Sequence, residues 1–141
     1  MTGLSILGKS GSCASGIKFY FNNGSSQTMG TSYGGDSPIL YFDSTSNRLA
    51  NVSSYGGNII DVLRICTETN KCVINGNVGG RNPNTQAVIN STWEITAFWG
   101  VRHQYNGFDC LANFGIFYTD IIGSTRNCTI ESNLTLFKSS F

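Results

Sequence analysis

Apolar residues recur at every second position between residues 93 and 99, where Trp93, Ile95, Ala97 and Trp99 alternate with Glu94, Thr96 and Phe98. This two-residue period predicts a strand with at least one buried face. A second β-prone run covers residues 111–118, and the connector between them contains Asn106-Gly107, a dipeptide that tolerates positive φ. The pattern predicts a β-hairpin with a loop over residues 101–109 that carries Asp109. This stretch taken alone is also compatible with an ordinary hairpin and a solvated carboxylate.

Short β-prone runs separated by turns occur along most of the chain. They cover residues 16–21, 26–29, 39–42, 49–52, 59–65, 73–74 and 87–89. No segment of 11 or more residues has the 3.6-residue period of an amphipathic helix. With 17 glycines and only two prolines, the pattern favours an all-β fold of about ten to twelve short strands and almost no helix.

Length and charge limit the domain organisation and the partners. The 141 residues are enough for one domain with its own core. Charged residues make up 12% of the chain, which is about half the usual share. Lys and Arg are scattered and form no basic stripe, so nucleic acid is not an expected partner. The sequence also has no apolar run long enough for a transmembrane helix.

The five cysteines leave several arrangements open. Cys66 and Cys72 flank a polar turn between two β-prone runs, so they are as compatible with a cross-strand disulfide as with two free thiols. No zinc site is expected, because the chain has no CxxC pair and His103 has no ligand nearby in sequence. The odd number leaves at least one thiol free or paired between chains.

Five glycosylation sequons are weak support for a secretory route; they begin at Asn23, Asn51, Asn90, Asn127 and Asn133. The first 30 residues lack a basic segment followed by an apolar signal core. We therefore expect a secreted protein whose signal peptide has been removed.

The order of these segments resembles that of jacalin-related lectin domains, the β-prism family that also supplies the sugar-binding module of aerolysin-like pore-forming proteins. Four segments, within residues 4–119, carry the resemblance. They are the Gly/Ser loop at 8–16, IKFYFNNGSSQTMG at 17–30, LANVSSYGGNIIDVLRICTETNK at 49–71, and ITAFWG…GFDCLANFGIFY at 95–118. The resemblance implies one β-prism of three sheets over residues 1–141.

The resemblance also implies a sugar site made of three loops. In the family, an Asp in the last loop accepts hydrogen bonds from adjacent sugar hydroxyls while backbone N–H groups donate to them. The matching residues here are Asp109 as the acceptor and Gly107 and Phe108 as the backbone donors. A carboxylate suits this role because it is a charge-assisted acceptor for two hydroxyls.

The other two loops of the implied site lie earlier in the chain. The aromatic residue of the middle loop corresponds to Tyr55, whose ring could cover the apolar face of a pyranose. The glycines of the N-terminal loop correspond to Gly8 and Gly11. Tyr105 stands four residues before Asp109, where the family usually has glycine, so we expect it to narrow the pocket or weaken binding.

Two further departures from the family concern strands. The strand pair that usually follows the glycine loop is short or absent here. A tail covering residues 120–141 follows the last family strand, and its runs at 121–122 and 134–137 are β-prone. We expect this tail to complete a sheet in place of the missing strand.

The resemblance implies a non-catalytic carbohydrate-binding module that needs no cofactor or metal and binds glycans or glycoproteins at a cell surface. A shallow polar site binds weakly, so a homo-oligomer or a larger toxin-type assembly would supply avidity. The alternative is a protein-interaction or adhesion module that has lost sugar binding and uses Tyr105 and Phe108. Glycoside hydrolysis is not expected, because it normally needs two close carboxylates and Glu94 and Asp120 lie outside the loop.

Overall fold

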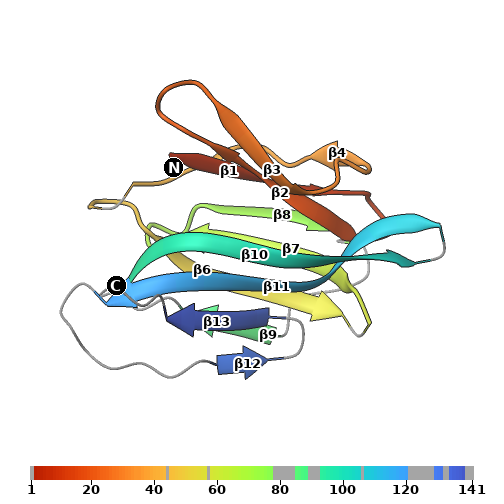
Figure 1. Ribbon diagram of the computed structural model, residues 1–141. Coiled ribbons are helices and arrows are strands. Elements are labelled where there is room, and N and C mark those ends of the chain that lie inside the picture. The colour runs from red at the N-terminus through yellow and green to blue at the C-terminus, as the bar shows by residue number, and fades with distance from the viewer. Residues whose placement is uncertain are drawn as a thin grey trace.

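The computed structural model describes residues 2–43, 45–56, 58–77, 85–88, 93–105, 107–120, 129–131 and 134–138. These residues form thirteen strands in three sheets and contain no helix, so the all-β prediction is confirmed (Figure 1). The number of strands is slightly higher than expected, and one two-residue strand, Gly35–Asp36, lies outside the predicted runs. None of the described segments is a helix that could cross a membrane.

The N-terminal sheet is built around its first strand, in which every residue is buried. Its strands are β1 (Gly3–Gly8), β2 (Ala14–Tyr20), β3 (Ser26–Gly30), β4 (Gly35–Asp36) and β5 (Leu40–Tyr41). β1, β2 and β3 form an antiparallel meander, while β4 and β5 pair with opposite ends of the other edge of β1. The β1–β2 loop therefore lies beside β4.

The middle sheet has the order β8-β7-β6-β9 and is antiparallel throughout. Its strands are β6 (Leu49–Gly56), β7 (Ile60–Thr67), β8 (Cys72–Gly76) and β9 (Thr85–Val88). Cys66 and Cys72 lie directly opposite each other on β7 and β8 and form a disulfide, as one of the two open interpretations predicted. Their Cα atoms are 4.1 Å apart.

The C-terminal sheet has the order β10-β11-β13-β12. Its strands are β10 (Trp93–Tyr105), β11 (Phe108–Asp120), β12 (Thr129–Glu131) and β13 (Leu134–Lys138). The predicted hairpin is confirmed, but the expected loop over residues 101–109 is wrong, because pairing continues to Tyr105 and Phe108. Asn106-Gly107 alone makes the connection, and Gly107 adopts a φ of 79°, which suits a tight hairpin turn.

The tail joins this sheet through a parallel pairing. β13 pairs with β11 over five positions, from Leu134 opposite Phe114 to Lys138 opposite Tyr118. β12 pairs with the other edge of β13. The tail thus continues the C-terminal sheet beyond the long hairpin.

One hydrophobic core is shared by all three sheets. Its buried residues are Leu4, Ile6, Ala14, Ile17, Phe19, Leu40, Leu49, Val52, Ile60, Leu63, Ile65, Val73, Leu111, Phe114, Ile116 and Tyr118. Phe98 on β10 stacks between Phe19 of the N-terminal sheet and Phe114 of β11, with ring centroids 4.9 and 5.7 Å apart respectively. Since each sheet buries one face against the other two, no sheet has a separate core.

Removing residues 125–141 should abolish cooperative folding, because it deletes β12 and β13 and exposes the edge of β11 over five residues. Circular dichroism during thermal melting would measure the loss. A chain that lacks only residues 139–141 keeps both strands and serves as the control, with unchanged melting expected. A protein without residues 125–141 that melts like the full chain would show that the tail is dispensable.

Candidate functional site

Three segments that are far apart in sequence meet at one end of the molecule. The β1–β2 loop, the end of β6 with the start of β7, and the β10–β11 turn all lie on the right side of Figure 1. The local sequence favours a turn in each segment, because glycine interrupts the apolar runs at Gly8, Gly56 and Gly107. The tertiary structure brings these three turns together.

A buried disulfide fastens the first of these segments to the last. Cys13 at the end of the β1–β2 loop is bonded to Cys110 on β11, across a sequence separation of 97 residues. The two cysteines are 0% and 1% exposed, and they form a small cluster with Ile59 from the middle segment. The three segments are therefore held together by one covalent bond and by the packing of Ile59 against it.

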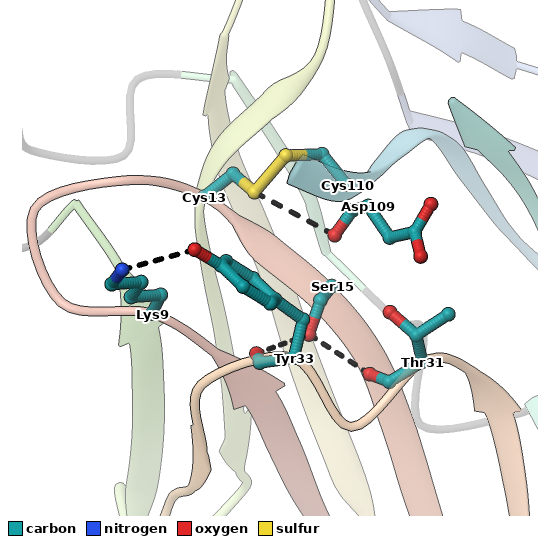
Figure 2. The surroundings of a disulfide bond; sticks show 7 residues. All are labelled: Lys9, Cys13, Ser15, Thr31, Tyr33, Asp109 and Cys110. Atoms are coloured by element: carbon teal, nitrogen blue, oxygen red, sulfur yellow. Dashed lines mark hydrogen bonds between the residues drawn. A yellow bond between two sulfur atoms is a disulfide. The ribbon is translucent and has the colours of Figure 1, made fainter. Parts of the chain in front are cut away.

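Asp109 directly precedes Cys110, one of the two cysteines of the disulfide. It lies in β11 opposite Gln104, while Cys110 lies opposite His103. Successive strand residues point to opposite faces, so the Cys110 side chain turns inward and the half-buried Asp109 side chain turns away from it. Figure 2 shows the carboxylate pointing away from the disulfide. The backbone oxygen of Asp109 is 3.9 Å from the Sγ of Cys13, a van der Waals contact because that sulfur carries no proton.

The β1–β2 loop is closed by its own backbone hydrogen bonds. The Lys9 N–H donates to the Cys13 oxygen and the Ser12 N–H donates to the Lys9 oxygen, each at 3.0 Å. Gly11 is exposed at the tip, and Gly8 lies so near the chain that an added Cβ would be 2.8 Å from the Cys13 oxygen. The two predicted glycines are thus in one tight loop attached to the Asp109 strand.

Residues 31–35 form a fourth segment of this end, which the sequence reasoning missed. The Lys9 Nζ donates to the Tyr33 Oη at 3.0 Å, and the Ser15 hydroxyl lies 2.9 Å from the backbone oxygens of both Thr31 and Tyr33 (Figure 2). Gly34 has a φ of 96°, and an added Cβ would be 2.1 Å from the Gly8 oxygen. This segment is therefore pressed against the glycine loop.

A sequence signal for this fourth segment does exist. The tripeptide Tyr-Gly-Gly occurs twice, at 33–35 and at 55–57, and only the second occurrence was assigned to the site. Tyr33 and Tyr55 are both half-buried. Tyr55 lies near the end of β6 opposite Val62, one residue before Gly56.

The remaining predicted residues flank the hairpin turn. Tyr105 is the last residue of β10 and pairs with Phe108, the first residue of β11. The side chains of both lie outside the described part of the structure. Cys128 also lies outside it. Gly107 is exposed between Tyr105 and Phe108. The structure thus places Gly8, Gly11 and Asp109 at one linked site, with Tyr55 at the end of a neighbouring strand.

This end of the molecule presents several polar groups at its surface. It offers a partly exposed carboxylate acceptor at Asp109, a Lys9–Tyr33 pair, and the exposed backbone of the β1–β2 loop. Within the described residues, no three His, Cys, Asp or Glu side chains gather as a metal site would require. Such groups can hold a ligand rich in hydroxyls through several hydrogen bonds.

No protein-family model matches the chain, and no curated protein matches its sequence.

The two disulfides should contribute unequally to stability. Replacing Cys13 and Cys110 together by alanine releases a loop of about 100 residues and should cost about 4–5 kcal/mol of unfolding free energy. The matched control is the Cys66→Ala/Cys72→Ala double variant, whose short loop predicts a cost of about 2 kcal/mol. Denaturant titration of the three proteins measures both costs. A larger loss in the control would contradict the chain-entropy argument.

Proposed function

We propose that this protein is a non-catalytic carbohydrate-binding module with a shallow, lectin-like sugar site around Asp109. The observation that carries the proposal is the Cys13–Cys110 disulfide, which holds the glycine loop beside Asp109 and packs against Ile59 of the middle segment. These are the three segments that form the sugar site in jacalin-related lectins. The similarity of arrangement supports a site of the same kind.

The chemistry of Asp109 supports a sugar ligand more than an apolar one. Asp109 is half-buried and its carboxylate points away from the Cys13–Cys110 disulfide, so it can accept hydrogen bonds from two neighbouring hydroxyls of a pyranose. Tyr33, which bonds to Lys9 of the glycine loop, and Tyr55, near the end of β6, each carry a ring that could cover the apolar face of a sugar. The ligand class that fits these groups is a neutral monosaccharide or the end of a glycan chain.

The proposal extends to the fold family. All three pairs of sheets are in contact, through β1 and β8, β2 and β11, and β7 and β11, around one core. Three sheets that pack on a common core are the arrangement of a β-prism, and this arrangement supports the resemblance to jacalin-related domains.

The spacing of carboxylates along the hairpin supports a non-catalytic role in this proposal. Asp120 lies eleven residues beyond Asp109 on β11, opposite Trp93, and strand geometry separates the two by roughly 35 Å. Glycosidases need their two carboxylates within about 10 Å. The two acidic residues nearest to Asp109 in sequence, Glu94 and Asp120, are therefore unsuitable partners for it.

The proposed setting is extracellular. Two disulfides form in the structure, and disulfides persist mainly in oxidising compartments. A shallow site that keeps much of its hydration gives weak monovalent affinity. Useful binding to glycans or glycoproteins on a cell surface would then depend on several copies, either in a homo-oligomer or in a larger assembly.

A second candidate function is protein interaction through the edge of the C-terminal sheet. β10 is the outer strand of that sheet, and its Val101 is 45% exposed. An exposed strand edge can pair with an extended segment of another protein. Such binding would be insensitive to free monosaccharide.

Replacing Asp109 by asparagine should reduce glycan binding by about 10- to 100-fold, since hydrogen bonds to a charged group contribute about 1.5–3 kcal/mol. A glycan array followed by titration of the best ligand would measure the change. The variant keeps the size of the side chain, and unchanged melting would show that the loss is local.

The matched control is Glu68→Gln, which makes the same change of charge at the other end of β7. Glu68 follows Thr67, whereas Ile60 at the start of β7 adjoins the site, so the two ends are roughly 25 Å apart. Glycan binding should be unchanged in this variant. Folded wild-type protein that binds no glycan would refute the proposal and favour the protein-interaction module.

A further inference from the structure

Two of the five sequons lie in the described residues, and their surroundings are opposite. Asn23-Gly24-Ser25 forms the turn between β2 and β3, where all three residues are exposed. Asn51-Val52-Ser53 lies inside β6, where Asn51 is half-buried and Ser53 is 4% exposed. The same three-residue motif therefore has very different access to a modifying enzyme.

The Asn23 side chain is held in a local turn by the serine of its own sequon. The backbone N–H and the hydroxyl of Ser25 both donate to the Asn23 Oδ1, at 3.0 and 2.6 Å. Gly24 permits this turn with a φ of 85°, and its N–H donates to the Phe21 oxygen at 3.1 Å. These contacts span a few neighbouring residues, so they can form in the chain before the sheets assemble.

The two hydrogen bonds to Oδ1 also alter the reactivity of the carboxamide. Donors on the oxygen draw electron density from the amide and make the Nδ2 protons more acidic. The Asn23 residue is exposed. The turn thus holds an accessible carboxamide in a form from which a base can more readily remove a proton.

We propose that Asn23 is an acceptor site for an N-linked oligosaccharide and that Asn51 is not. The donor is a lipid-linked oligosaccharide diphosphate of the eukaryotic secretory pathway. A bond forms between the Asn23 Nδ2 and the anomeric carbon, and the bond from that carbon to the diphosphate oxygen breaks. The lipid diphosphate leaves with the electron pair, and one Nδ2 proton passes to a base of the transferase.

The folded structure excludes the same modification at Asn51. Asn51 pairs with Cys66 of β7 on one side and with Val88 of β9 on the other. Ser53 is paired with the same two strands, and its hydroxyl is buried. Because Asn51 is half-buried and paired on both sides, we expect chains with a glycan on its amide to fail to complete the middle sheet.

A glycan on Asn23 would lie far from the candidate sugar site. β2 begins at Ala14, next to Cys13 of the site, and ends at Tyr20, just before the Asn23 turn. Seven strand residues separate the two ends by roughly 23 Å. Figure 1 shows the β2–β3 turn and the β1–β2 loop at opposite ends of β2. Glycosylation would therefore shield the exposed strand β3 and leave the Asp109 surface accessible.

Secretion of the full chain from eukaryotic cells behind an added signal peptide tests the proposal. Enzymatic removal of N-glycans converts each occupied Asn to Asp, so peptide mass mapping reports occupancy at every sequon separately. We expect occupancy at Asn23 in most molecules and none at Asn51 in the folded, secreted fraction. Retained protein is mapped in the same way.

Three variants separate the chemistry of the site from the folding of the chain. Asn23→Gln and Ser25→Ala should each remove the glycan at this turn, whereas Ser25→Thr retains the hydroxyl and should retain the glycan. Both substituted positions are exposed, so the variants should melt like the wild type. An unoccupied Asn23, or a folded fraction that carries a glycan on Asn51, would overturn the proposal whatever the glycan array shows for Asp109.

Discussion

The packing of three sheets on one core is the constraint on which the rest of this structure depends. Each sheet has one apolar face, and each face is covered by the other two sheets. The Phe19–Phe98–Phe114 stack is the clearest example, because it joins strands from the first and last sheets through aromatic contacts. A sheet removed from this arrangement would expose its apolar face to water, so the sheets are expected to fold together.

The candidate site is a consequence of this packing at one end of the molecule. Packing of β2 against β11 brings the β1–β2 loop to the start of β11, and the Cys13–Cys110 disulfide then fastens the two. The neighbouring residue, Asp109, points to the face opposite to Cys110 because successive strand residues alternate. A binding surface thus arises from turns at the ends of strands, while the strands themselves serve the core.

The two proposals concern opposite ends of β2. The end near Cys13 carries the candidate sugar site, and the end near Asn23 carries the proposed glycan acceptor. A module that binds glycans and also carries one needs these surfaces to be separate. The length of an extended seven-residue strand provides that separation.

Much of the local structure was determined by the sequence alone. Alternation from Trp93 to Trp99, the Asn106-Gly107 turn and the scattered β-prone runs were enough to predict an all-β chain and its long hairpin, because these depend on neighbouring residues. The predicted strands of that hairpin were too short. Residues 102–104 are polar, and only continued backbone pairing with β11 makes them part of a strand.

Only the tertiary structure decided which distant residues meet. The partner of Cys13 is 97 residues away, and no local pattern distinguishes Cys110 from the other cysteines as that partner. Sequence patterns also did not indicate the contacts of Tyr33 with Lys9 and Ser15. These contacts depend on how residues 31–35 pack against the glycine loop. Local sequence determines strands and turns through steric and hydrogen-bonding preferences, whereas contacts between distant segments are set by how the sheets bury their shared core.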